Sequence, residues 1–194
     1  MFNIHAAEKS AHRKFTKLIK SHTAAIYTDT CFRLPFILRH RRELQQNGQR
    51  VKVTKSVQLE LGNKNKQVWA KRKLNTLRKS GKYFELLPGN KQERRRIYTQ
   101  KLSAYADEGF VEIFSKDGPL QNVLLTGDYA LAQKLAGISS TVAVFFQYST
   151  ADSGTHVVLW SDYQKKSAAV LLKSSGMEPV DYKRPIRTLP CSPQ

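Results

Sequence analysis

Short apolar runs alternate with amphipathic segments along most of the chain, and each pattern predicts one kind of element. Runs that are rich in β-branched or other apolar residues and end at a turn indicate buried strands at Ile26, Val51, Val123 and Val142. Apolar residues at three- and four-residue spacing indicate helices around and between these strands. The predicted helices cover residues 5–20, 31–44, 55–66, 66–80, 91–106, 107–116, 128–137 and 161–176.

Strands that alternate with helices are typical of a parallel sheet that helices cover on both faces. The pattern therefore predicts an α/β fold with three α/β/α layers and a central, mainly parallel sheet. Residues 155–160, THVVLW, are a candidate for one more strand. Residues 82–90, KYFELLPGN, are interpreted as a connection, because Pro88 and Gly89 mark a turn.

The length of 194 residues suits one main domain with short appendages. We expect a basic N-terminal helix over residues 1–23, the main domain over 24–176, and an irregular tail over 177–194 that holds four of the seven prolines. No run approaches the roughly 18 apolar residues of a membrane span, and the first residues lack the apolar stretch of a secretory signal. The expectation is a cytoplasmic protein without a membrane partner.

The chain carries 33 Lys and Arg residues against 15 Asp and Glu residues, which gives a formal net charge of +18. A surplus of this size indicates a polyanionic partner, nucleic acid first, although a lysine-rich surface can also serve solubility. Cations on the predicted basic helices and beside the acidic residues are the candidates for binding nucleic acid. They are Lys55, Lys64, Lys71, Arg72, Arg78, Arg94 and Arg95.

The cysteines and histidines argue against a disulfide framework and against zinc. Cys31 and Cys191 lie at opposite ends of the sequence, which suits a reducing compartment. The five histidines show no paired metal-ligand spacing, so we expect them at the surface.

Four acidic residues occupy matching places in the predicted elements. Asp29 closes the first strand, Glu60 lies in the first turns of the helix after the second, Asp128 follows the third, and Asp107 opens the helix before it. The carboxyl ends of parallel strands meet at one edge, so these side chains are expected to converge there. Grouped carboxylates repel one another unless a cation joins them. Oxygen ligands suit Mg²⁺ or Mn²⁺, ions that activate water for phosphodiester cleavage.

Each acid also has a structural interpretation. Asp29 can end a strand in a turn, Glu60 can complement a helix dipole, and Asp107 can cap a helix, in which case Glu108 or Glu112 can replace it as the ligand. Trp69 and four phenylalanines are interpreted as core, whereas the aromatic residues beside turns are candidates for stacking on unpaired bases. The core group is Trp69, Phe110, Phe114, Phe145 and Phe146, and the stacking candidates are Tyr148 and Trp160.

In order and spacing, the acidic segments resemble the PIN-domain ribonucleases. The segments are IYTDTCFRLPFI with Asp29, VKVTKSVQLELGNK with Glu60, ADEGFVEIF with Asp107, and VLLTGDYALAQKLAGISSTVAVFF with Asp128. The last is the closest match, and the resemblance spans roughly residues 24 to 148. Cys31 departs from the small polar residue that is usual after Asp-Thr.

The resemblance implies a flavodoxin-like parallel sheet that binds one or two Mg²⁺ or Mn²⁺ ions and cleaves single-stranded RNA. It further implies that Asp29, Glu60, Asp107 and Asp128 ligate metal directly or through water, and that Thr30 and Thr126 orient carboxylates. The expected function is a metal-dependent endoribonuclease that uses metal-activated water. A non-catalytic RNA- or DNA-binding module and a structure-specific DNA nuclease are the alternatives.

The expected partner is single-stranded RNA, with a protein inhibitor or antitoxin as a further candidate. A toxin, an RNA-processing enzyme and a defence factor against mobile elements all remain open, as does the oligomeric state.

Overall fold

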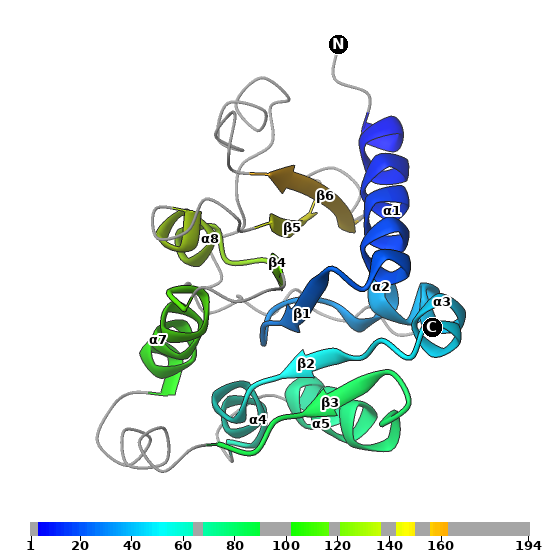
Figure 1. Ribbon diagram of the computed structural model, residues 1–194. Coiled ribbons are helices and arrows are strands. Elements are labelled where there is room, and N and C mark those ends of the chain that lie inside the picture. Colours follow the sequence, from blue (N-terminus) through cyan, green and yellow to red (C-terminus); the bar gives the residue numbers. More distant parts are fainter. Residues whose placement is uncertain are drawn as a thin grey trace, which may run out of the picture.

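The computed structural model describes residues 4–63, 68–89, 102–116, 121–136, 143–149 and 156–162. Helices and strands alternate along this part of the chain, as the apolar pattern predicts (Figure 1). The helices are α1 (Ile4–Ser21), α2 (Leu34–Arg39), α3 (Arg41–Gln46), α4 (Lys55–Gly62), α5 (Val68–Lys79), α7 (Leu102–Phe114) and α8 (Tyr129–Ala136). The strands are β1 (Ala24–Thr28), β2 (Val51–Val53), β3 (Phe84–Leu86), β4 (Gln121–Thr126), β5 (Ala143–Ser149) and β6 (His156–Asp162).

The strands form one sheet in the order β3-β2-β1-β4-β5-β6. Strands β1 to β5 are parallel, with Ile26 paired to Val123 and Val53 to Leu86, whereas β6 runs antiparallel to β5. The mixed α/β class and the mainly parallel sheet are therefore confirmed. Strand β3 extends the sheet beyond β2, and β6 forms the opposite edge.

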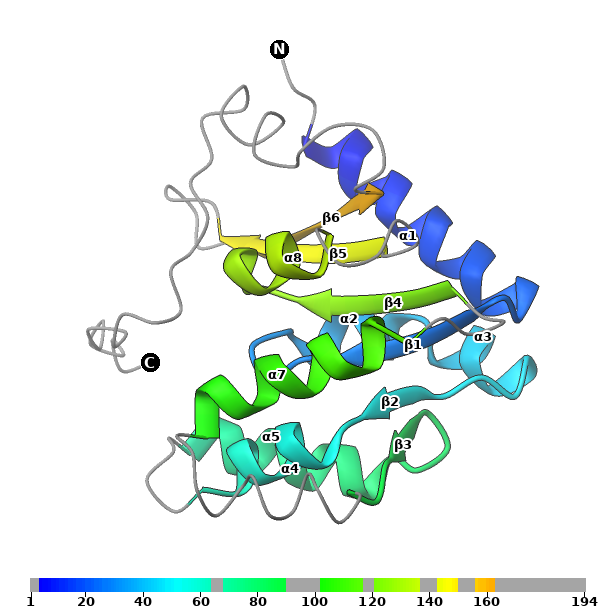
Figure 2. The same ribbon diagram turned by 60° about the vertical axis from the view of Figure 1, so that its left-hand side comes forward.

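Helices pack against the sheet from opposite directions. In Figures 1 and 2, α1, α2 and α3 lie to one side of the strands, and α7 and α8 lie to the other. The apolar stripe of α1 is fully buried, and its Phe15 ring lies 5.2 Å from that of Phe36 in α2. From α7, the Phe114 ring lies 5.7 Å from Tyr27 of β1. The buried residues of β1 and β4 occupy the middle of this core.

Several predicted elements differ from the observed ones. The segment 82–90, interpreted as a connection, contains the edge strand β3, whose three residues pair with β2 but are too few to give a periodic signal. The helix predicted over 31–44 is divided at His40 into α2 and α3, and Pro35 lies in the first turn of α2. The predicted helix over 161–176 lies outside the described residues, except that 161 and 162 end β6. The tail over 177–194 also lies outside them.

A chain of polar contacts holds α1 to the junction of α2 and α3. His12 Nδ1 lies 2.7 Å from His40 Nε2, Arg39 Nη1 lies 3.2 Å from His12 Nε2, and Thr16 Oγ1 lies 3.3 Å from His40 Nδ1. Because arginine only donates, His12 Nε2 accepts, so His12 Nδ1 donates to His40 and His40 Nδ1 donates to Thr16. Both imidazoles are neutral in this arrangement. The expectation that the histidines lie at the surface is wrong for His40, which is buried.

This contact predicts that the protein loses stability in acid. The pKa of His40 is lowered from 6.5 to about 4, chiefly by burial and next by the charge of His12, with Arg39 acting in the same direction and Glu43 opposing it. Between pH 4 and pH 6.5 the unfolded chain binds more protons at His40 than the folded chain does. The contribution of neutral His40 to stability is therefore complete above pH 6.5 and is lost as the pH falls towards 4. Urea titrations measure the free energy of unfolding at pH 7 and at pH 4.5. Its loss between these pH values should be ~1 to 2 kcal/mol larger in the wild type than in His40→Gln. An equal pH dependence of stability in the two proteins would contradict this account. His22 is exposed, so His22→Gln is the control and should keep the pH dependence of the wild type.

Candidate active site

The candidate site lies where β1 and β4 end side by side. Asp29 directly follows β1, and its backbone N–H donates to the Leu125 carbonyl of β4 at 2.9 Å. Connections from β1 lead through β2 to β3 on one side, while β4 leads to β5 on the other. The direction of the connections therefore reverses between β1 and β4, and this is the place where open α/β sheets usually bind ligands.

Asp29 is only 5% exposed, and three donors form hydrogen bonds with its carboxylate. Its Oδ1 accepts from the backbone N–H of Thr30 at 2.6 Å. Its Oδ2 accepts from Thr126 Oγ1 at 2.8 Å and from Cys31 Sγ at 3.0 Å. Hydrogen bonds to an ionised acceptor are stronger than neutral ones, so these contacts fix the orientation of the carboxylate.

Thr30 joins Asp29 to Glu60. The Thr30 hydroxyl donates to Glu60 Oε2 at 2.8 Å, and Glu60 is buried on α4. The start of α4 is fixed because the Thr54 side chain accepts from the backbone N–H of Val57 at 3.3 Å, as an N-cap does. Asp29 and Glu60 therefore both form hydrogen bonds with Thr30.

Lys73 of α5 is a buried cation beneath the same turn. Its Nζ donates to the carbonyls of Asp29 at 3.1 Å, Thr30 at 2.7 Å and Phe32, which uses all three of its N–H bonds. Burial lowers the pKa of Lys73 to about 8, although the negative charges of Asp29 and Glu60 act to raise it. Lys73 therefore supplies positive charge beside the two carboxylates.

Lys73 follows two exposed cations in the sequence, yet only 7% of it is exposed. Val68 is apolar, yet it is 65% exposed. The signal for the correct face was present, because the buried positions of α5 follow the helical spacing and include the lysine. They are Ala70, Lys73, Leu74 and Leu77.

Thr126 connects Asp128 to the same centre. The Thr126 hydroxyl donates to Asp29 and accepts from the backbone N–H of Asp128 at 2.9 Å. The Asp128 carboxylate accepts from Leu131 N–H at 3.0 Å and so caps α8. One hydroxyl thus contacts both residues, and Asp128 combines the cap with a position at the candidate site.

Asp107 does not open a helix, contrary to the sequence interpretation. Helix α7 begins at Leu102, so Asp107 lies inside it, two residues before Gly109. At Gly109, α7 passes so close to α4 that an added Cβ would lie 3.4 Å from Ser56 Oγ. Asp107 therefore lies on a helix that packs against the one carrying Glu60.

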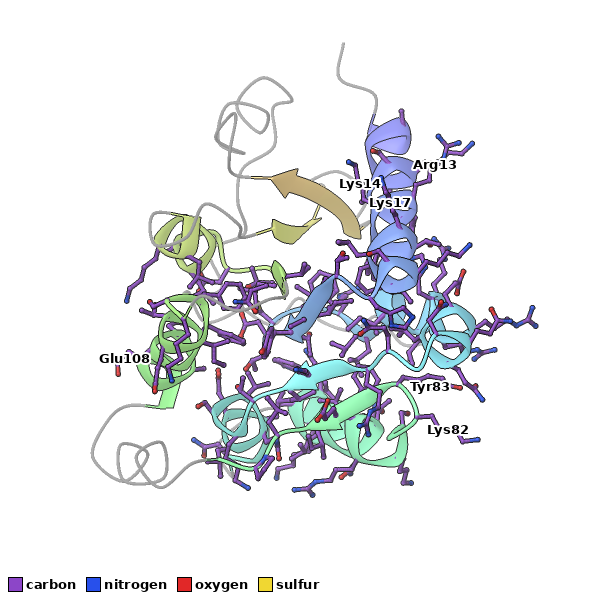
Figure 3. The ribbon with its side chains drawn as sticks, in the orientation of Figure 1. Arg13, Lys14, Lys17, Lys82, Tyr83 and Glu108 are labelled. Carbon is purple, nitrogen blue, oxygen red and sulfur yellow. The ribbon has the colours of Figure 1, made fainter. Side chains whose placement is uncertain are left out.

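The two acids that could replace Asp107 point to the surface. Figure 3 shows Glu108 projecting from the side of α7 that faces away from the strands. Glu112 lies 3.4 Å from Lys116, its neighbour one turn later. This pair is a salt bridge at the surface between residues one helical turn apart.

Cys31 takes part in the site in a way that the sequence did not reveal. Its Sγ donates to Asp29 and accepts from the backbone N–H of Gly127 at 3.1 Å, so it ties the two strand ends together. Burial, followed by the charge of Asp29 and its hydrogen bond, raises the pKa of Cys31 well above its usual value. The group is therefore a neutral thiol at pH 7 and acts as a donor.

The donor set fits a hard divalent cation. Carboxylate oxygens from Asp29 and Glu60 are the ligands that Mg²⁺ and Mn²⁺ accept, whereas zinc favours nitrogen and sulfur. Among the described residues, no group of three or more His, Cys, Asp or Glu side chains is assembled closely enough to hold an ion by itself. Mg²⁺ usually binds through one or two carboxylates and keeps several waters, so Asp29 and Glu60 are the residues that could supply such ligands.

The predicted nucleic-acid-binding residues are only partly described. Lys71, Arg72 and Arg78 are exposed on α5, and Lys55 is half-buried at the start of α4. Lys64, Arg94 and Arg95 lie outside the described residues. Of the proposed stacking residues, Tyr148 is in β5 and Trp160 is in β6.

Comparison with known proteins identifies no relative, because no family model, no curated protein and no solved structure matches the chain. None of the helices in the described ranges is long and apolar enough to cross a membrane. The functional argument therefore depends on the chemistry of the site itself.

Proposed function

We propose that this protein is a metal-dependent endoribonuclease with a PIN-like, three-layer α/β/α architecture. The order β3-β2-β1-β4-β5 and the helices on either side of the strands support this architecture. The observation that carries the proposal is the buried Asp29 carboxylate, which Thr30 links to Glu60 and Thr126 links to the turn of Asp128. Three acids from separate parts of the sequence are connected by two threonines.

The charge balance of the site favours a divalent cation. Asp29 and Glu60 carry two negative charges, whereas Lys73 supplies one positive charge beside them. A net negative charge therefore remains, and Asp128 adds to it at the neighbouring strand end. Closely spaced negative charges in a partly buried place are stabilised when a cation binds.

Each residue has a defined part in the proposed mechanism. Asp29 and Glu60 would hold Mg²⁺ or Mn²⁺, which when bound supplies an activated water and stabilises charge on the phosphate. Thr30 and Thr126 orient the carboxylates, and Lys73 fixes the turn that carries Asp29. The exposed Lys71, Arg72 and Arg78 attract the phosphate backbone.

One observation favours the second candidate, a non-catalytic nucleic-acid-binding module. Asp128 caps α8, and this role needs no metal. A binding module would show a steep salt dependence of RNA affinity but no effect of divalent ions. A nuclease should instead gain thermal stability from Mn²⁺ by mass action and cut RNA. RNA and DNA oligonucleotides compared at one salt concentration separate the ribonuclease from a DNA nuclease.

Asp128→Asn separates the charge of this residue from its capping role. Asparagine caps helices as well as aspartate does, so α8 should keep its start and the melting temperature should stay close to that of the wild type. Cleavage of single-stranded RNA in Mn²⁺ is expected to fall about 10²- to 10³-fold, because one of the negative charges that favour binding of the divalent ion is lost. Single-turnover rates on a labelled oligonucleotide measure this change. An undiminished rate would remove Asp128 from the mechanism.

A further inference from the structure

Two large apolar side chains are exposed at the start of α5. Trp69 is 44% exposed and Val68 is 65% exposed, and they are the exposed large hydrophobic residues of the described ranges. The sequence interpretation assigned Trp69 to the core, which is wrong. Single exposed apolar residues are common, but here two adjacent ones form a small apolar surface.

Trp69 lies at the edge of the sheet that carries the candidate site. Helix α5 ends at Lys79 and β3 begins at Phe84, so the end of α5 lies near the amino ends of the strands. The start of α5, with Trp69, therefore lies towards the carboxyl ends of the strands. Trp69 and Lys73 are four residues apart and are therefore neighbours on one face of the helix. Lys73 donates to the carbonyls of Asp29 and Thr30, which follow β1. Trp69 therefore lies one turn of α5 away from a residue that contacts the candidate site.

Cations adjoin this indole. Lys71 and Arg72 are exposed on the first turns of α5, and Arg72 is three residues from Trp69, again a neighbouring position. An exposed aromatic ring beside exposed cations matches the chemistry of single-stranded nucleic acid, in which flat bases alternate with phosphates. The charges also argue against an apolar protein partner as the occupant, since such a surface would have to desolvate both cations.

We propose that Trp69 stacks on an unpaired base of a single-stranded RNA whose phosphodiester lies at the Asp29 and Glu60 centre, and that Arg72 binds an adjacent phosphate. The proposal rests on the proposed function in that it takes RNA as the ligand. Stacking on Trp69 would also make the protein prefer single-stranded RNA. Bases within a duplex are stacked on their neighbours and leave no free face for the indole. Trp69 is a substrate-binding residue and takes no part in the chemical step.

Binding measured without divalent ion tests this proposal apart from cleavage. The chain has two tryptophans, so the Trp160→Phe variant leaves Trp69 as the fluorescent probe. An oligouridylate of about ten nucleotides, titrated in EDTA, should quench this fluorescence with saturation. In the wild-type background, Trp69→Ala should raise the Kd about 5- to 100-fold, and Trp69→Tyr should restore most of the affinity.

An abasic oligonucleotide of the same length separates stacking from folding effects. It keeps the phosphates but removes the bases, so wild type and Trp69→Ala should bind it equally. Tyr83→Leu is the control for an aromatic residue at the opposite edge, near the entry to β3 (Figure 3), and should not change the affinity for oligouridylate.

Three outcomes would overturn the proposal. Unchanged oligouridylate binding by Trp69→Ala removes the stacking role while leaving the nuclease proposal intact. An equal loss of affinity for the abasic strand makes the role of Trp69 structural. Failure of the wild-type protein to bind RNA at all refutes both this inference and the proposed function.

Discussion

Asp29→Asn is expected to reduce Mn²⁺-dependent RNA cleavage at least about 1000-fold, a loss of roughly 4 kcal/mol of transition-state stabilisation. The change removes one of the two charges that would hold the ion. It also places an amide where the Oδ2 atom accepts from Thr126 and Cys31, so that donor faces donor if the NH₂ group takes this side. Both effects act on the same carboxylate, which makes this the largest activity change expected for the chain.

Two measurements separate loss of the ion from loss of the fold. Mn²⁺ affinity, followed by calorimetry or by the paramagnetic signal of the free ion, should fall together with the cleavage rate. Far-ultraviolet circular dichroism should stay unchanged at a temperature well below the melting point. Glu112→Gln is the matched control, because this acid belongs to the surface pair with Lys116. A variant Asp29→Asn that binds Mn²⁺ and cuts RNA normally would refute the proposed metal centre.

Lys73→Met is expected to lower the free energy of unfolding by about 3 to 5 kcal/mol. Methionine fills a similar volume, but the carbonyls of Asp29, Thr30 and Phe32 lose their donor. A buried acceptor without a partner costs about 1 to 3 kcal/mol, and the carboxylates of Asp29 and Glu60 also lose their internal cation. Breaking a buried charged network is costly because the remaining partners stay buried, so the effect should be much larger than that of a surface lysine.

Urea unfolding with a matched pair of variants measures this effect. Lys71→Met removes an exposed lysine from the same helix and should change the stability by less than about 0.5 kcal/mol. Lys73→Arg keeps the charge but has a planar head that fits three converging carbonyls poorly, so an intermediate loss is expected. Equal stabilities of Lys73→Met and Lys71→Met would show that the buried ammonium contributes nothing to the fold.

The arrangement of Asp29, Thr30, Glu60 and Asp128 could be anticipated because it follows from topology. Each of the three acids lies just after a strand or in the helix that follows it, and the pairing of β1 with β4 brings positions 29 and 126 together. Parallel strands share one carboxyl edge, so a sequence pattern that fixes strand direction also fixes which ends meet. This part of the prediction did not require knowledge of individual hydrogen bonds between side chains.

Features that depend on competition between interactions could not be anticipated in the same way. A charged residue on an apolar stripe, such as Lys73, is read as exposed unless its backbone acceptors are known. Asp107 has the residue type of an N-cap, but α7 begins at Leu102 and packing against α4 overrides the local preference. Trp69 is large and apolar, yet it falls outside the buried stripe of α5. Each of these outcomes is set by contacts far away in the sequence.

The turn after β1 also has a consequence for protein synthesis. Its Asp29 takes hydrogen bonds from a side chain 97 positions later, and its carbonyls are held by a lysine 44 positions later. A nascent chain that has not yet been translated beyond β4 lacks Thr126, one of the three donors to this carboxylate. If the chain is a ribonuclease, each newly made copy can complete its catalytic centre only after β4 has been translated.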